Sequence, residues 1–208
     1  MLEFARELIS IPTENPPGKA AEACARVLRD RLRRMGFPIE PKTPGHSVRS
    51  FYGRGKPTLY FHGHFDVVPA ASPAQFLPSI RGGKLFGRGS SDMKGGLVAM
   101  IYAMRAIQEC ALKLDGRIAL IFVAYEETGG ARSSQVLAPQ FEMCPGLLET
   151  RFYNRIGVPA LAYGPGLLSV SHGPNEFVAV RNIFDCALIY ALTAVKALSA
   201  HPGRLKEE

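Results

Sequence analysis

The chain has 208 residues, 47% of them hydrophobic and 21% charged, with a formal net charge of +7. This length predicts a globular chain that buries one substantial core. No run approaches the roughly 18 consecutive apolar residues of a membrane span, and no signal-peptide core follows Met1, so we expect neither a membrane protein nor a secreted one. The four cysteines stand singly, outside any zinc-knuckle or disulfide pattern. We therefore expect reduced thiols and a cytoplasmic location.

Basic residues outnumber acidic ones, 25 to 18, which is compatible with an acidic partner such as nucleic acid. The densest basic cluster, residues 26–34, lies in a segment whose apolar residues recur at helical spacing. Such a cluster is typical of a solvated helix face. No surface motif of aromatic and basic residues accompanies it, so we expect no nucleic-acid partner.

Helices and strands alternate along the first part of the chain. A short helix over residues 2–9 runs into a Pro- and Gly-rich turn, and a second helix ends at Gly36. Residues 58–61 and 117–124 are short apolar runs typical of buried strands. The helix predicted between them has the apolar stripe Leu97, Met100, Ile101, Met104 and Ile107. Strand, helix and strand form a βαβ-like unit.

The last part of the chain predicts one more strand and a long helix. Residues 158–163 are apolar and end in a Gly-Pro-Gly turn, and a helix begins near residue 175. Residues 131–150 offer at most a short helix. The stripe expected to pack the long helix on the sheet is Phe177, Val180, Phe184, Leu188, Leu192, Val195 and Leu198. We therefore expect an α/β fold, a single three-layer domain over residues 1–208 with a mostly parallel twisted sheet between helices.

Polar residues follow the first predicted strand, where an open α/β sheet usually places its ligand site. His64 and Asp66 are two residues apart, so in a strand they face the same side. A hydrogen-bonded structural histidine is the ordinary alternative. Asp92 lies in a glycine-rich turn, residues 87–96, that leads into the apolar helix, where an aspartate is also a common helix cap. The Walker spacing of a phosphate loop is absent.

Glu126 and Glu127 are adjacent carboxylates at the exit of the most apolar strand. They would repel each other unless one binds a cation and the other is free to accept a proton, although two solvated glutamates would also fit a loop entry. His172, before the last helix, supplies a second imidazole. Two histidines and three carboxylates suit one or two Zn²⁺-like ions in a catalytic site. A barrel amidohydrolase is set aside because the chain is shorter than such barrels.

Five segments, taken in order, resemble the co-catalytic zinc deacylases and carboxypeptidases, the group of acetylornithine deacetylase, succinyl-diaminopimelate desuccinylase, aminoacylase and carboxypeptidase G. The segments are LISIPTENPPG, HGHFDVVP, GRGSSDMKGG, EETGG and YGPGLLSVSHGPNEFV. The resemblance spans nearly all of residues 1–200. It implies a metal-dependent hydrolase that cleaves the amide bond of N-acyl amino acids or small peptides.

The resemblance also assigns metal ligands. It implies that His64 binds one Zn²⁺ ion and that Asp92 bridges two ions. Glu127 and His172 would complete the ligands of the second ion. Co²⁺ or Mn²⁺ would suit the same nitrogen and oxygen donors.

Catalytic roles fall, by the same resemblance, to Asp66 and Glu126. Asp66 would orient a metal-binding imidazole through its carboxylate. Glu126 would be the general base and take a proton from a water that the ions activate.

The family pattern is interrupted near residues 140–144, where an inserted domain used for dimerisation and substrate contacts is missing. A carboxylate ligand is missing with it, and Glu142 and Glu149 are the two candidate replacements. We expect one metal to bind more weakly than the other. The sequence leaves the oligomeric state open, and a monomer is compatible with the missing dimerisation domain. We also expect the junction, residues 138–146, to be exposed and mobile.

Two alternatives stay open. The first alternative to the amide hydrolase is a non-catalytic or weakly active trimmed scaffold that keeps the residues of its family. The second is a lidless aminopeptidase-like enzyme. The missing ligand favours the scaffold. The intact polar cluster favours the enzyme, because a drifting remnant has no physical need for it.

Overall fold

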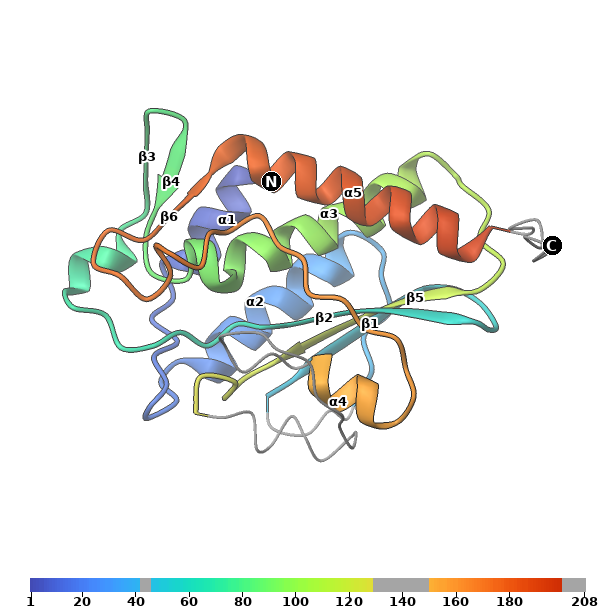
Figure 1. Ribbon diagram of the computed structural model, residues 1–208, viewed down its shortest axis with the longest axis horizontal. Helices are drawn as coiled ribbons and strands as arrows, with labels where there is room; N and C mark the ends of the chain where they lie inside the picture. The colour runs from blue at the N-terminus through green and yellow to red at the C-terminus, as the bar shows by residue number, and fades with distance from the viewer. Residues whose placement is uncertain (42–45, 129–149, 200–208) are drawn as a thin grey trace, which may run out of the picture.

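The computed structural model describes residues 1–41, 46–128 and 150–199. Within these ranges, a larger and a smaller sheet lie among the helices (Figure 1). The helices are α1 (Leu2–Ile9), α2 (Ala21–Arg34), η1 (Pro73–Phe76), η2 (Ser90–Lys94), α3 (Gly95–Glu109), α4 (Thr150–Arg155) and α5 (Val180–Leu198). The strands are β1 (Val48–Gly53), β2 (Thr58–His64), β3 (Ser79–Arg81), β4 (Lys84–Phe86), β5 (Arg117–Val123) and β6 (Phe177–Ala179).

The larger sheet has the order β1-β5-β2. β2 runs parallel to β5, from the pair of Thr58 with Arg117 to the pair of His64 with Val123. β1 runs antiparallel to β5. β5 is apolar and paired on both edges, so most of its residues are buried. The predicted α/β class with a sheet between helices is confirmed, and its described strands form one parallel and one antiparallel pair.

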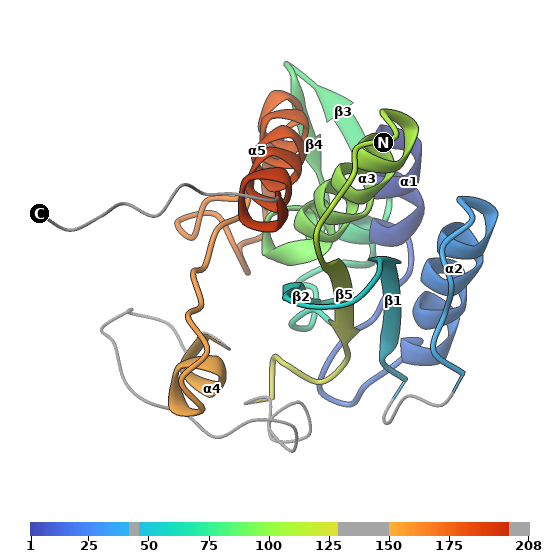
Figure 2. The same ribbon diagram turned by 90° about the vertical axis from the view of Figure 1, so that its right-hand side faces the viewer.

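Helices lie on both sides of this sheet (Figures 1 and 2). Gly63 of β2 faces α3, because a Cβ atom there would collide with the side chain of Leu97. The adjacent His62 faces the other side, where its Nδ1 atom lies 2.9 Å from the hydroxyl of Tyr153 in α4. Neighbouring residues of a strand point to opposite faces, which explains the two different partners.

The described residues share one hydrophobic core, in which α3 is packed between the sheet and α5. The buried residues of α5 itself are Ile183, Cys186, Ala187, Tyr190, Ala194 and Leu198. The predicted stripe is therefore wrong in its middle, since Phe184, Leu188 and Leu192 face outward and Leu188 is 58% exposed. α5 is apolar on more than one face, so its apolar residues alone do not indicate which face is buried.

Two further expectations for this part of the chain are corrected. Residues 158–163 form no strand, and Leu161 is 96% exposed. Apolar composition does not make a strand where no neighbouring strand pairs with it, and Pro159 lacks an N–H donor. The last helix begins at Val180 rather than near residue 175, because Phe177–Ala179 pairs with β4 as β6.

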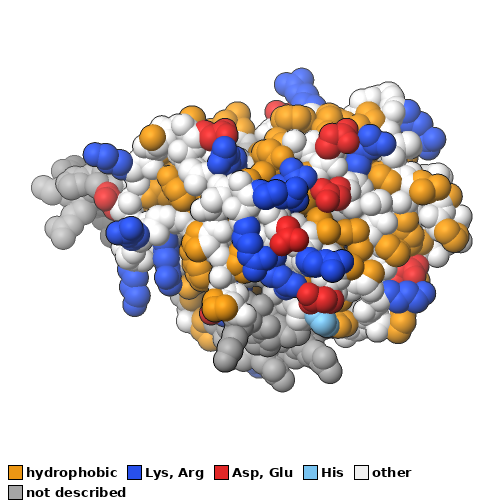
Figure 3. Space-filling model, turned by 180° about the vertical axis from the view of Figure 1, so that it is seen from behind, with side chains coloured by type: hydrophobic (Ala, Val, Ile, Leu, Met, Phe, Trp, Pro, Cys, Tyr) orange, Lys and Arg blue, Asp and Glu red, His pale blue; other side chains and the backbone are white. Residues whose placement is uncertain are grey.

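Three of the five arginines of α2 form ion pairs with acidic residues. Arg29 forms an ion pair with Glu22, and Arg31 lies 3.0 Å from Glu7 of α1. Figure 3 shows basic and acidic side chains interspersed on one face of the molecule. These pairs agree with a solvated helix face.

None of the described helices has the length and hydrophobicity that crossing a bilayer requires. Cys24, Cys110 and Cys186 are free thiols. The expectations for residues 138–146, Glu142 and Glu149 lie outside the described residues.

Candidate metal centre

His64 ends β2 and is buried. Its Nδ1 atom lies 3.1 Å from the backbone oxygen of Asp66, which can only accept, so Nδ1 carries a proton. The Nε2 atom is thereby turned toward Asp92, 3.1 Å from Oδ1. Burial lowers the pKa of His64, but its contacts with the carboxylates of Asp66 and Asp92 outweigh burial and raise the pKa well above its usual value. The two carboxylates therefore favour the protonated form of the metal-free ring.

Asp66 is buried beside the His64 ring, with Oδ1 3.3 Å from Nδ1. Its Oδ2 atom accepts hydrogen bonds from Asn15 Nδ2 at 2.8 Å and from the backbone N–H of Glu127 at 3.1 Å. Burial raises the pKa of Asp66, but the contact with His64 and these hydrogen bonds lower it below its usual value. Asp66 is thus an ionised carboxylate that touches the imidazole at the end of β2 and the backbone at the end of β5.

Asp92 lies between two imidazoles. Its Oδ1 atom faces His64, and its Oδ2 atom lies 3.3 Å from Nε2 of His172. The backbone of Asp92 leaves helical geometry, with φ −125° and ψ 99°, which turns the side chain toward the end of β2. The start of α3 has no side-chain cap, so the capping alternative for Asp92 is not observed.

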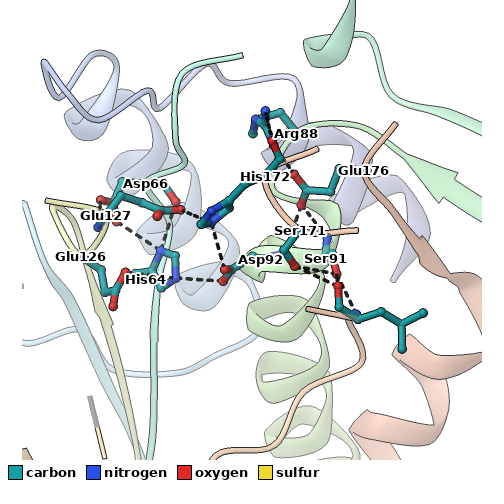
Figure 4. Close-up of polar contacts among 11 residues, drawn as sticks. His64, Asp66, Arg88, Ser91, Asp92, Glu126, Glu127, Ser171, His172 and Glu176 are labelled. Carbon is teal, nitrogen blue, oxygen red and sulfur yellow. Dashed lines mark hydrogen bonds and ion pairs between the residues drawn. The ribbon is translucent and has the colours of Figure 1, made fainter. Parts of the chain in front are cut away.

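The two glutamates that follow β5 take different positions (Figure 4). Glu127 Oε1 lies 3.4 Å from His172 Nε2, is buried and accepts no hydrogen bond from any described residue. Burial raises the pKa of Glu127 to about 7. Glu126 lies beside His64, with Oε2 3.8 Å from His64 Nε2.

His172 reaches the cluster from the loop that precedes β6. Its backbone is left-handed, with φ 64°, and its side chain is 46% exposed. The loop is held against η2 by Ser91, whose hydroxyl oxygen accepts a hydrogen bond from the backbone N–H of Leu167 at 2.8 Å. His172 therefore joins the cluster through loop contacts and not through a strand (Figure 4).

These side chains fit a divalent cation. One donor atom from each of His64, Asp92 and Glu127 lies within 4.8 Å of the others. Imidazole nitrogens with carboxylate oxygens are the donor set of Zn²⁺ and similar ions. The buried Glu127 oxygen is the observation that favours a cation, because a carboxylate oxygen removed from water is costly without a donor or a metal.

Three residues that support the cluster received no role from the sequence. They are Asn15, Arg88 and Glu176. Asn15 lies in the Pro- and Gly-rich turn, and the other two lie inside motif segments that carry the expected ligands. All three act through hydrogen bonds to a neighbouring residue's backbone or carboxylate. Their position in the motifs was the one available signal, because no spacing rule marks such a contact.

Residues 60–143 match the sequence model of peptidase family M20/M25/M40. This segment contains His64, Asp92 and both adjacent glutamates, and it ends before His172.

Solved structures with a similar fold include a metallo-carboxypeptidase and two dipeptidases. The M20 family metallo-carboxypeptidase Sso-CP2 from Sulfolobus solfataricus is 24% identical, with a TM-score of 0.59 over 65% of this chain and 33% of that one. Human carnosine dipeptidase 1 is 25% identical, with a TM-score of 0.56 over 65% and 34%. The dipeptidase Dug1p from Saccharomyces cerevisiae is 22% identical, with a TM-score of 0.56 over the same shares, 65% and 34%.

The chain spans about a third of the length of these proteins. The described sheet flanked by helices corresponds to their common fold. Together with the ligand cluster, the family match supports a metal-dependent hydrolase. Residues 60–143 thus match the M20/M25/M40 peptidase family, and the fold of the described chain is that of an M20 peptidase catalytic domain.

Proposed function

We propose that the chain is the catalytic part of a metal-dependent hydrolase that cleaves an amide bond in N-acyl amino acids or small peptides. One observation carries this proposal. The two carboxylate oxygens of Asp92 face two different imidazoles, His64 at 3.1 Å and His172 at 3.3 Å. A carboxylate between two nitrogen donors is the arrangement that two neighbouring cations require of a bridging ligand.

His64, Asp92, Glu127 and His172 would hold the ions, with Zn²⁺ as the first choice and Co²⁺ or Mn²⁺ as alternatives. When bound, such ions polarise an amide carbonyl and lower the pKa of a coordinated water. The resemblance assigns Asp92, Glu127 and His172 to one ion, but only His64 and Asp92 to the other, because a carboxylate ligand of the family pattern is missing. We therefore propose that the ion beside His64 binds more weakly than the other.

Glu126 is proposed as the general base. Its carboxylate is partly exposed and lies 3.8 Å from His64, on the edge of the cluster and not inside it. In that place it accepts a proton from the attacking water and returns it to the leaving amine. Asp66 acts on His64, where its contact at Nδ1 leaves Nε2 available to a cation.

The proposed substrate type, domain organisation and location rest mainly on the sequence. The five motif segments support a deacetylase, desuccinylase or carboxypeptidase type of substrate, and similar structures include a carboxypeptidase and dipeptidases. We propose one catalytic domain over residues 1–208 that is monomeric without the inserted domain. The singly placed thiols support a cytoplasmic location.

A trimmed scaffold with little or no activity is the second candidate. It is favoured by the interruption of the family pattern near residues 140–144, where a carboxylate ligand is missing. Contacts that close over the substrate contribute to catalysis, and a chain that lacks them would bind metal but turn over slowly.

Metal analysis and a hydrolysis screen test the proposal together. Metal per chain is measured by elemental analysis after dialysis against Zn²⁺. Hydrolysis is screened on N-acetyl amino acids, N-succinyl amino acids and dipeptides. Bound metal with hydrolysis supports the enzyme, bound metal without hydrolysis supports the scaffold, and a chain that binds no metal contradicts both.

Glu126→Gln is the sharpest variant for the enzyme. It keeps the shape of the side chain but cannot accept a proton, so hydrolysis should fall on the order of 10² to 10⁴-fold while metal content is unchanged. Glu109→Gln, at an exposed position at the end of α3, is the matched control and should keep full activity. Loss of metal from Glu126→Gln would instead make Glu126 a ligand, and unchanged hydrolysis would place the base elsewhere.

A further inference from the structure

Arg88 and Glu176 form a buried ion pair beside the candidate metal centre. Their exposures are 2% and 1%, and Nη1 of Arg88 lies 2.7 Å from Oε2 of Glu176. Removing two charges from water is costly, and a buried pair contributes little net stability compared with apolar residues of similar size. The position of this pair therefore calls for an account other than stability.

Glu176 contacts the backbone that carries Asp92. Its second oxygen, Oε1, accepts hydrogen bonds from the backbone N–H of Ser91 at 2.9 Å and from that of Asp92 at 3.1 Å. Because two consecutive N–H groups converge on one carboxylate oxygen, the non-helical backbone of η2 is held in one orientation. The Asp92 side chain is oriented as a consequence.

Arg88 contacts the backbone that carries His172. Its Nη2 atom donates to the carbonyl oxygen of His172 at 3.0 Å, and a longer contact reaches Pro69 O at 3.5 Å. His172 has a left-handed backbone, φ 64°, which is unfavourable for a residue with a Cβ atom and persists only where neighbours hold it. The guanidinium is planar and rigid, so one fork serves Glu176 and His172 at once.

We propose that Arg88 and Glu176 are positioning residues that hold Asp92 and His172 at the separation needed for a shared cation. The pair touches neither carboxylate nor imidazole of these two residues; it holds both backbones, one from each end (Figure 4). This inference rests on the proposed function, because it assigns the pair a purpose only if Asp92 and His172 bind metal. It adds two residues that neither approach the ion nor act on substrate.

The double variant Arg88→Met/Glu176→Met tests the proposal without leaving a buried charge unpaired. Zn²⁺ affinity is measured by competition with a chelator, and unfolding by urea denaturation. We expect affinity to fall by about 10 to 100-fold, the usual cost of losing groups that orient metal ligands. Leu28→Ala, in the buried face of α2, is the control that loses stability but keeps its affinity.

Arg88→Lys separates the two ends of the pair and also covers the case in which the double variant does not fold. A lysine keeps a charge opposite Glu176, but it has no second nitrogen in the plane for the His172 carbonyl. We expect Ser91 and Asp92 to keep the slow amide exchange of the wild type, and Zn²⁺ affinity still to fall. Unchanged affinity in the double variant would overturn the proposal, and so would unchanged affinity in Arg88→Lys where the double variant does not fold.

Failure of the proposed function is distinguishable from failure of this inference. If the wild type binds no Zn²⁺, the proposed function fails. Amide exchange in the metal-free protein then decides whether the pair orders this backbone. Exchange at Ser91 and Asp92 should be about tenfold faster in the double variant than in Leu28→Ala if local opening is easier. Equal exchange in the two variants would overturn the positioning role.

Discussion

The two imidazoles of the candidate metal centre are the same chemical group, held by opposite means. His64 is buried at the end of a strand, and its Nδ1 contacts Asp66, two residues away. His172 lies in a loop, is 46% exposed, and is held by Arg88, a residue 84 positions away in the chain. The sheet holds the His64 half of the site in place, whereas the long-range ion pair of Arg88 and Glu176 holds the His172 half. A site of this kind keeps one half when the other loosens.

Asp92→Ala gives the largest expected effect, because Asp92 contacts both halves. Metal content should fall at both positions, with a loss of affinity beyond the roughly 100-fold that a supporting group can cause. Elemental analysis of dialysed protein measures it. Metal content equal to that of the wild type would remove the bridging role of Asp92.

Single histidine variants should separate the halves. His64→Ala and His172→Ala should each empty one position and leave the other ion bound, because each ring faces a different oxygen of Asp92. Native mass spectrometry with Zn²⁺ counts the ions per chain. The His64→Ala protein should retain the tighter ion. If one variant loses both ions, the two positions depend on each other and the comparison fails.

Asn15→Ala should weaken the His64 half alone. Asn15 donates to Asp66 Oδ2 at 2.8 Å, and its loss leaves a buried carboxylate oxygen with one donor fewer. We expect about a tenfold loss of Zn²⁺ affinity, the lower end for a group of this kind. Isothermal titration measures it, with Asn154→Ala in α4 as the control. A loss of the ion beside His172 in the same experiment would contradict the separation.

Glu14→Gln should give the smallest effect, a slight loss of stability at neutral pH that disappears in acid. The hydrogen bond from the backbone N–H of Ala70 and the ion pair with Lys19 lower the pKa of Glu14 below its ordinary value of 4.5. A carboxylate with a lowered folded-state pKa stabilises the fold above the unfolded pKa, and that stability is lost as pH falls through the folded pKa. Urea unfolding should show Glu14→Gln less stable than wild type by about 0.5 kcal/mol at pH 7. The difference should shrink below pH 4, and a constant difference would assign it to packing.

Local sequence features predicted the central part of the fold. The strand, helix and strand that became β2, α3 and β5 were predicted because apolar periodicity and breaker residues are local signals. Which apolar face of α5 is buried depends on the elements packed against the helix and not on the local sequence, and the prediction was wrong there. The strand predicted over residues 158–163 was wrong for the same reason, since a strand forms only where a neighbouring strand pairs with it.

For the site, polar residues at strand ends indicated His64, Asp66, Glu126 and Glu127, and the structure brings them together with Asp92 and His172. Their roles stay predictions. Arg88 and Glu176 were not assigned, because their contacts are to backbone atoms more than 80 residues away. Pattern reasoning identifies groups that carry chemistry more readily than groups that hold them.

The close approach of two loops at Gly166 has a consequence for how the centre can vary. A Cβ atom at this position would collide with the backbone oxygen and the hydroxyl of Ser91, the residue before Asp92. Backbone atoms cannot retreat as a flexible side chain can, so a single methyl group would act as a wedge between the loop of His172 and the turn of Asp92. The distance between the loop of His172 and the turn of Asp92 therefore depends on a glycine at position 166.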